Sequence, residues 1–316
     1  MKLPNKTVVA AVKADYDEHL YERLERVISL AGDLNISASQ PIVIKINLCD
    51  VRTPESGAVT HPRFLDTLLR LLRQKVGQNP IYVVESDAVV ILADLVMEWL
   101  GFKPILQRWG AQWVNLAKCP TAIKKVQGYY LKEAPIATVF DGSYFISLAK
   151  LKTNRLSTTT CILKIQFGCS TIVDKKIYHP HLAEVIADLN KLMHPDFGIV
   201  DGIIGQGGPQ GPAFGMPIHS QVIIAGKDPV AVDTACARMM GFNPRTIAHI
   251  RRAAQLGIGS MQYQLVSDGL EKMAWNYRGN PLERMIINIG LRLQSRARKQ
   301  LKTAGRPATG ESLSSL

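Results

Sequence analysis

The stretch YFISLAKLKTNRLSTTTCILKIQFG, residues 144–168, joins an apolar run to a cationic, hydroxyl-rich segment. The run YFISLA has the length and composition of a buried β-strand. Basic residues continue from Lys150 to His181, and Asp174 is the only acid among them. Because apolar runs enclose this segment on both sides, we expect folding to hold its charges in a crevice, where they would attract anions.

Runs of the same kind recur along the chain and indicate the fold class. Further apolar, β-branched runs begin at Thr7, Pro41, Pro80, Phe197 and Ser220. Between the runs lie segments with apolar residues three and four positions apart, the spacing of amphipathic helices: 16–31, 62–76, 89–100, 181–193, 229–240 and 244–255. Strands that alternate with helices predict an α/β fold, with a largely parallel sheet flanked by helices.

The order of these segments also predicts the domain organisation. An irregular stretch over residues 109–139 gives way to a new strand signal, so we place a boundary near Asp141. We therefore expect an N-terminal α/β lobe over residues 1–141 and a second α/β lobe, with Lys/Thr-rich and Gly/Pro-rich loops, over residues 142–262. Residues 263–316 are expected to form a basic helical extension with a frayed tail.

The composition is that of an ordinary globular protein: 316 residues, 47% hydrophobic and 20% charged. No run reaches the roughly 18 consecutive apolar residues that a membrane span needs, and the N-terminus lacks the apolar stretch of a signal peptide. The five cysteines include no C-x-x-C pair. These features predict a soluble cytoplasmic protein with reduced thiols and no transmembrane segment.

The formal net charge of +12 favours acidic partners. Part of this charge is concentrated near the C-terminus, where seven basic residues and no acid lie from Arg284 to Arg306. Isoleucines and leucines interleave them, which predicts a basic amphipathic helix. Two interpretations stay open for residues 284–306: contact with nucleic acid or an anionic membrane, or a solvated helix packed on the body of the protein.

Eight short motifs occur in order along the chain. They are KINL (45–48), THP (60–62), ESD (85–87), KLKTN (150–154), LKIQFG (163–168), IVDGIIGQGGPQGP (199–212), AGKDPVAVDTACARMMGF (225–242) and GIGS (257–260). In this series the chain resembles the DUF362 family, a domain without an assigned general activity, from about Lys45 to Ser260. A more distant likeness to nickel-dependent lactate racemases, whose lysine and histidines hold a pyridinium cofactor, is an analogy that no motif carries.

The resemblance also bears on metals and redox chemistry. Many relatives append a ferredoxin-type module with clustered cysteines, which implies electron transfer, and this chain has no such cluster. Asn154 stands where the lysine motif of the family typically ends in His, and Lys164-Ile165-Gln166 replaces the usual Lys-Asn before Phe-Gly. A metal at Asn154 is therefore not expected, and the sequence names no cofactor.

Polar residues at the ends of the predicted strands are the first candidates for a site, because ligands of parallel α/β sheets collect at the carboxyl ends of the strands. Lys45 and Asn47 stand two apart and share a strand face. Lys45 either pairs with a carboxylate such as Glu85 or Asp87, or contacts the ligand. Both readings stay open from the sequence.

The segment after the central run offers further candidates. Lys150 and Lys152 again share a strand face, and Thr158, Thr160 and Lys164 follow at a predicted helix start. Cations, hydroxyls and free amides in one loop suit an oxyanion. These five residues are therefore predicted to bind an anionic substrate.

Residues that open or end other elements complete the set. Thr60 is expected to cap the helix after it or to help hold an anion, which leaves His61 as a candidate acid, base or metal ligand. Asp201 ends a predicted strand and is the candidate carboxylate for acid–base work. Gly207 and Gly208, in the loop GQGGPQGP, would allow a ligand to approach the backbone closely.

Two histidines and one aspartate carry weaker expectations. His179 and His181 could bind a metal only if a third ligand, such as His61, Asp201 or a cysteine, comes close. Asp233 lies on a predicted helix among apolar residues, so an inward carboxylate would need a partner such as Lys150 or Lys164.

These residues together predict a cationic pocket for a small anionic organic substrate, a carboxylate or a phosphate ester. Lys45, Lys150, Lys152 and Lys164 would hold the anion, and Asp201 or His61 would handle a proton. Two alternatives remain. One is a non-enzymatic binder of nucleic acid or anionic membrane that uses the C-terminal basic helix; the other is a metal-dependent or electron-transfer accessory protein.

Overall fold

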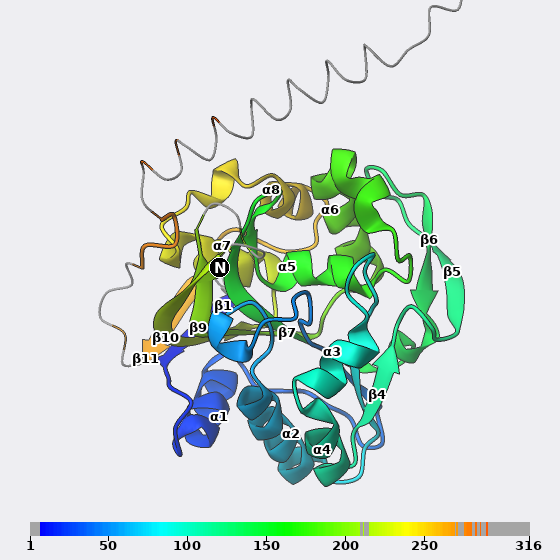
Figure 1. The fold of residues 1–316 in the computed structure, drawn as a ribbon, viewed down its shortest axis with the longest axis vertical. Helices are drawn as coiled ribbons and strands as arrows, with labels where there is room; N and C mark the ends of the chain where they lie inside the picture. The colour runs from blue at the N-terminus through cyan, green and yellow to red at the C-terminus, as the bar shows by residue number, and fades with distance from the viewer. Residues whose placement is uncertain are drawn as a thin grey trace, which may run out of the picture. The chain divides into compact units, whose positions relative to one another are not determined.

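The computed structural model describes residues 7–208, 211, 215–268, 270, 275–279, 282, 285 and 289. By their contacts, the residues up to Arg278 form one compact unit and Gly279–Leu316 form a second. The labelled helices and strands all belong to the first unit (Figure 1). Apart from residues 285 and 289, the basic segment predicted over residues 284–306 lies outside the described residues, so its role stays a prediction.

A nine-stranded sheet forms the centre of the first unit in the described part of the chain, with the order β11-β1-β10-β9-β7-β2-β3-β4 and β8 paired to β7. Strands β9, β7, β2, β3 and β4 run parallel to one another, whereas β10 is antiparallel to both β9 and β1. The strands are β1 (Val8–Lys13), β2 (Ile42–Lys45), β3 (Ile81–Glu85), β4 (Gln112–Asn115), β7 (Tyr144–Asn154), β8 (Thr158–Thr160), β9 (Phe197–Gly207), β10 (Met216–Gly226) and β11 (Gln264–Asp268). A separate hairpin pairs β5 (Thr121–Lys125) with β6 (Glu133–Ala137).

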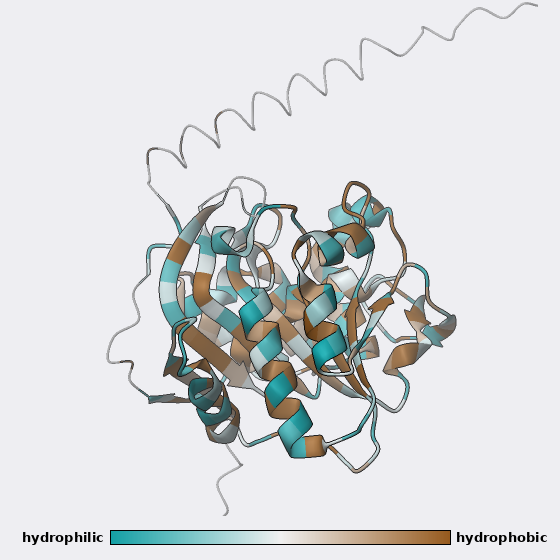
Figure 2. Cartoon of the chain, turned by 60° about the horizontal axis from the view of Figure 1, so that its bottom comes forward, coloured by the Kyte–Doolittle hydropathy of each residue, from teal (hydrophilic) through white to brown (hydrophobic). Residues whose placement is uncertain are grey.

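Helices cover both faces of this sheet (Figure 1). One face packs against α1 (Leu20–Leu30), α2 (Pro62–Val76), α3 (Ala93–Trp99) and α4 (Phe102–Arg108). The other packs against α5 (Ile162–Ile165), α6 (Leu182–Leu192), α7 (Pro229–Met239) and α8 (Ala248–Gln255). In Figure 2 the strands of the sheet are largely brown and the covering helices alternate teal and brown, as expected for amphipathic helices on an apolar sheet.

The predicted α/β fold is confirmed, and α2 has the predicted bounds, Pro62–Val76. The irregular stretch predicted over residues 109–139 is wrong in part, because it holds β4 and the β5–β6 hairpin. β5 is largely exposed and lacks an apolar run, so no hydrophobic pattern marked it. The helix α4 and the edge strand β11 were also not predicted.

One predicted strand end is also wrong. The strand that was predicted to end at Asp201 continues as β9 through Gly207, so the first part of GQGGPQGP is sheet and not loop. Gly205 allows this continuation, since an added Cβ there would lie 2.5 Å from the Leu151 carbonyl oxygen of β7 and 2.0 Å from the Tyr277 hydroxyl. The predicted boundary near Asp141 lies between β6 and β7, and β7 pairs in one sheet with β2 on one side and β9 on the other.

In the described part of the chain, no helix has the length and apolar character needed to cross a membrane.

Candidate functional site

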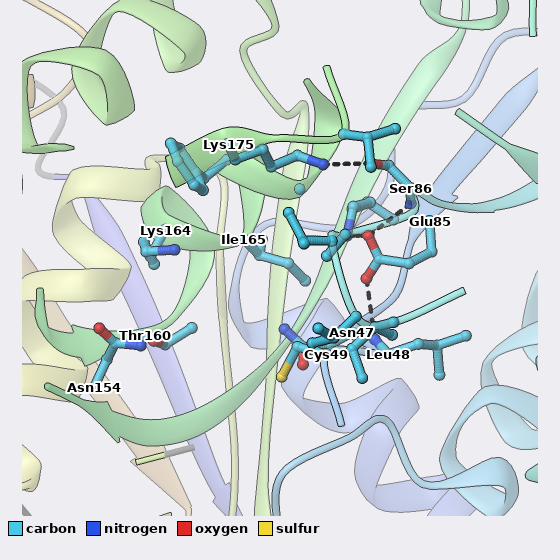
Figure 3. Close-up of a pocket in the computed structure, with 18 of the residues that line it drawn as sticks. Asn47, Leu48, Cys49, Glu85, Ser86, Asn154, Thr160, Lys164, Ile165 and Lys175 are labelled. Carbon is cyan, nitrogen blue, oxygen red and sulfur yellow. Dashed lines mark hydrogen bonds and ion pairs between the residues drawn. The ribbon is translucent and has the colours of Figure 1, made fainter. Parts of the chain in front are cut away.

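A pocket of about 310 Å³ lies at the carboxyl ends of β2, β3 and β7 (Figure 3). From β2 the chain first adds β3 on one side of the sheet and later adds β7 on the other side. This reversal makes the β2–β7 junction a topological switch point, where parallel α/β sheets bind ligands. We call this cavity the lysine pocket, after five lysines among its lining residues: Lys45, Lys152, Lys164, Lys175 and Lys176.

Lys45 lies at the end of β2 and is almost completely buried. Its Nζ lies 2.7 Å from Glu85 Oε1 and donates to the Ile46 carbonyl oxygen at 2.7 Å. Glu85 also accepts from the backbone N–H groups of Leu48 and Ser86. Of the two readings left open by the sequence, the structure shows the pairing with Glu85, which neutralises the charge of Lys45 within the pocket wall.

Gly168 packs against this ion pair. A Cβ added to Gly168 would come within 2.9 Å of Lys45 Nζ and 3.0 Å of Glu85 Oε1. Any other residue at this position would therefore displace the pair or move the segment that follows α5. The glycine of the motif LKIQFG thus has a steric role in the pocket wall.

Lys152 reaches past the end of β2, because β7 continues beyond it. Its Nζ donates to Asn47 Oδ1 at 2.7 Å and to the Ala58 carbonyl oxygen at 2.6 Å, and it lies 3.0 Å from Cys49 Sγ. These acceptors carry no formal negative charge. These contacts fix the position of the Lys152 ammonium. None of the described contacts is with a carboxylate that would neutralise its positive charge.

Lys164 differs from the other lining lysines. Its Nζ lies 4.4 Å from the centroid of the Phe167 ring, and it has no hydrogen-bond acceptor or carboxylate partner among the described residues. Burial lowers the pKa of Lys164 to about 8; Cys49 opposes this shift, and the positive charges of Lys152, Lys45 and Lys175 add to it. This amine can therefore gain and lose a proton near neutral pH.

Thr160 adds an open polar group to the same wall. Its side chain is 5% exposed, and its hydroxyl oxygen has no hydrogen-bond partner in the described part of the chain. Figure 3 shows Thr160 and Lys164 on the same side of the pocket. A buried hydroxyl without a partner costs free energy, which a bound ligand can recover.

The remaining cations come from the turn Lys175–His181; its lysines belong to the segment predicted to lie in a crevice but were not named as substrate-binding residues. Lys175 Nζ donates to Ser86 Oγ at 2.6 Å and to the Asp87 carbonyl oxygen at 2.8 Å (Figure 3). Lys176 and His179 line the pocket from exposed positions. The run of lysines in the sequence was a signal for them, but their approach to β3 depends on the path of the chain after α5.

Lys150 and Asp201 do not line the pocket, contrary to the prediction that they share it with Lys152. Both side chains are completely buried, and Lys150 Nζ lies 2.9 Å from Asp201 Oδ2. The Tyr16 hydroxyl donates to Asp201 and lies 3.2 Å from Lys150 Nζ. The pairing register between β7 and β9 shifts here, so that Lys150 lies opposite Asp201 and Lys152 lies opposite Gln206.

His61 belongs to this second cluster, because its ring stacks on Tyr16 with 3.8 Å between the ring centroids. It is also the N-cap of α2: its Nδ1 accepts from the backbone N–H of Arg63 at 3.1 Å. Thr60, the predicted cap, instead bonds Asn47, whose backbone N–H donates to Thr60 Oγ1 at 2.9 Å. Burial lowers the pKa of His61 to about 4, so its ring is neutral at pH 7.

The predicted helix start at Thr158 is wrong. Thr158 lies exposed with φ of 69° at the start of β8, outside the pocket. Helix α5 begins later, at Ile162, and the Asp233 carboxylate accepts from the N–H groups of Ile162 and Leu163 at 2.7 and 3.2 Å. Asp233 therefore occupies the amides that were expected to hold an anion, and it is not paired with Lys150 or Lys164 as predicted.

Gly207 and Gly208 also lie outside the pocket lining. A Cβ on Gly207 would come within 2.3 Å of Ile218 Cδ1, so this glycine allows close packing between β9 and β10. Gly208 accepts from Thr153 Oγ1 through its carbonyl oxygen at 2.6 Å. Gly207 therefore allows close packing between strands, and Gly208 adopts a φ of 101°, which glycine favours.

A metal at His179 and His181 was predicted to need a third ligand close by, and none occurs among the described residues. No group of three His, Cys, Asp or Glu side chains that could hold an ion occurs there. His181 stacks on Tyr130, with 4.4 Å between the ring centroids. Asn154, which departs from the His of the family motif, accepts from the N–H groups of Leu156 and Ser157 and stabilises the turn after β7.

Comparisons with known proteins bear on the whole chain. The model of a family described as a domain of unknown function, DUF362, matches residues 42–238, which is more than half of the chain. The chain belongs to this family. Every residue that lines the lysine pocket, from Lys45 to His179, lies within the matched range. No curated protein matches the chain.

Among solved structures, this DUF362 protein is similar to the lactate racemase apoprotein from Thermoanaerobacterium thermosaccharolyticum, at 10% sequence identity and a TM-score of 0.43. The similarity covers 76% of this chain and 59% of that chain, so this protein spans less than two thirds of the racemase. A likeness this weak carries no statement about activity.

Proposed function

We propose that this DUF362 protein binds a small organic anion, a carboxylate or a phosphate ester, in the lysine pocket and performs acid–base chemistry on it. The observation that carries the proposal is the charge of the wall: the lining residues include five lysines and a single carboxylate, Glu85. Glu85 pairs with Lys45, and no other lining residue is a carboxylate that could offset Lys152 and Lys164. An anion in the cavity would offset them.

The open groups suggest how the anion would be held. The Lys164 ammonium and the Thr160 hydroxyl are free to donate to it, and charge-assisted hydrogen bonds of this kind are the strong ones. Lys175 and Lys176, from the turn Lys175–His181, add positive charge to the pocket. We assign to Lys164 the proton transfer that was predicted for Asp201 or His61, because Lys164 lines the pocket and the other two residues do not.

A thermal-shift experiment tests the proposal. Oxalate, malonate and glycerol 3-phosphate would be added to the wild type, to Lys164→Ala and to Lys132→Ala, which removes an exposed lysine outside the pocket. At least one anion should stabilise the wild type and Lys132→Ala but not Lys164→Ala. Lys164 is the better choice than Lys152, whose removal would leave the Ala58 carbonyl oxygen without its partner. If none of the anions stabilises the wild type, the proposal is wrong.

A further inference from the structure

Lys164 is partly buried, and its surroundings differ from those of the fully buried lysines in this part of the fold. Lys45 and Lys150 each contact a carboxylate, and Lys152 donates to two oxygen acceptors. Lys164 has only an aromatic ring beside it among the described residues. A lysine that serves to stabilise the fold would have an acceptor, so the surroundings of Lys164 do not indicate a structural role.

The same surroundings prepare the amine for nucleophilic attack. Burial and three neighbouring ammonium groups lower its pKa to about 8, so an appreciable fraction is unprotonated near neutral pH. An amine that is desolvated or placed beside other cations is the usual form of a lysine that reacts with carbonyl compounds. The pocket also has apolar lining residues, among them Ile165 and Phe167 from the same segment and Leu48 from the loop after β2.

We propose that Lys164 forms an imine with an organic anion that also carries a carbonyl group, with oxo-carboxylates as the simplest members of this substrate class. The inference rests on the proposed function, since the lysine pocket must first bind the anionic end of the molecule. Lys152 and the Thr160 hydroxyl would hold that end, and the carbonyl carbon would face Lys164.

The step balances without an oxidant or a reductant. The lone pair of the neutral Lys164 amine attacks the carbonyl carbon, and the carbonyl oxygen takes up a proton to give a carbinolamine. Loss of that oxygen as water forms the carbon–nitrogen double bond. The protonated imine withdraws electrons from the adjacent carbon, so the enzyme could then remove a proton or carbon dioxide there.

Reductive trapping with glyoxylate tests the inference. Glyoxylate carries an aldehyde beside a carboxylate, and oxalate has the same anionic end without the aldehyde. The full-length protein would be incubated with glyoxylate and borohydride at neutral pH, with and without excess oxalate, and the labelled lysine located by peptide mass spectrometry. Borohydride delivers hydride to the imine carbon and leaves a carboxymethyl group on the lysine.

The expected result is a carboxymethyl group on Lys164 at low glyoxylate, at least about tenfold above any other lysine, and protection by oxalate. Lys164→Arg, with a wild-type circular dichroism spectrum, should lose this label, and Lys132→Ala should keep it. Labelling spread evenly over exposed lysines, in a protein that binds oxalate, would overturn the imine and leave anion binding standing. Failure of the wild type to bind any of the anions, oxalate included, would remove the proposed function as well.

Discussion

Lys45 and Glu85 illustrate how a charge can be held inside this protein at the level of single residues. The two side chains are 1% and 8% exposed and 2.7 Å apart. Glu85→Gln would leave the Lys45 ammonium buried without its carboxylate, so we expect a loss of about 3–5 kcal/mol in the free energy of unfolding. Urea unfolding measures this directly.

An exposed ion pair provides the matched control for this substitution. Lys103 and Glu98 lie 3.3 Å apart with side chains more than half exposed, so Glu98→Gln should cost less than about 1 kcal/mol. The double variant Lys45→Met/Glu85→Gln should recover much of the stability lost in Glu85→Gln. Equal stability of Glu85→Gln and Glu98→Gln would contradict the account of the pocket wall.

Removing the charge of Lys164 should increase the free energy of unfolding near pH 7, because no carboxylate in the described fold pairs with this amine. Its pKa is about 8 in the folded protein and 10.5 ordinarily, so between these values only the unfolded chain keeps the proton. Stability conferred by the neutral amine therefore increases with pH over this window, and below about pH 8 the charged amine weakens the fold. We expect Lys164→Met to be more stable than the wild type near pH 7 by about 1–2 kcal/mol.

The difference between Lys164→Met and the wild type should shrink as the pH rises from about 8 to about 10.5. Urea unfolding of both proteins across this range provides the measurement. A variant that is less stable than the wild type near pH 7 would show that Lys164 has a stabilising partner.

The cap of helix α2 makes the stability of this helix depend on pH. His61 caps it through Nδ1, and the pKa of His61 is lowered to about 4, from an ordinary 6.5, chiefly by burial. The stabilisation by this neutral cap is complete above about pH 6.5 and is lost as the pH falls through about 4. His61→Asn, whose amide oxygen can cap without titrating, should flatten the fall in stability between these values.

Thermal unfolding of the wild type and His61→Asn between about pH 7 and pH 4 checks this expectation. His61→Ala, which removes the cap, should cost about 1 kcal/mol near pH 7. Identical pH profiles for the wild type and His61→Asn would show that groups other than His61 cause the loss of stability at acidic pH.

Elements with a strong apolar period were predictable from the sequence, and α2 is the clearest case. The pairing of Lys45 with Glu85 could be named as one of two outcomes, since both follow parallel strands. The pairing of Lys150 opposite Asp201 and of Lys152 opposite Gln206 could not be predicted, because it depends on a register shift against β9. The continuation of β9 through Gly205 was equally hidden, because the space left by the missing Cβ is filled by Leu151 and Tyr277.

At the level of the whole first unit, one sheet connects segments from both predicted lobes. β7 lies between β2 and β9, so the carboxyl-end pocket takes Lys45 from before residue 141 and Lys152 and Lys164 from after it. We therefore expect residues 7–278 to unfold in a single cooperative transition. Far-ultraviolet circular dichroism and tryptophan fluorescence, recorded together in urea, should give coincident curves; two separated transitions would indicate independent lobes.

The affinity of the full-length protein for oxalate, measured by calorimetry near pH 7 and near pH 9.5, tests the lysine pocket most directly. The wild type and Lys132→Ala should bind, and Lys164→Ala should bind at least about tenfold more weakly near pH 7, as expected for loss of a charge-assisted hydrogen bond. Wild-type affinity should fall toward that of Lys164→Ala near pH 9.5, where the Lys164 amine is neutral. No binding by the wild type, or equal binding by Lys164→Ala, would contradict the account.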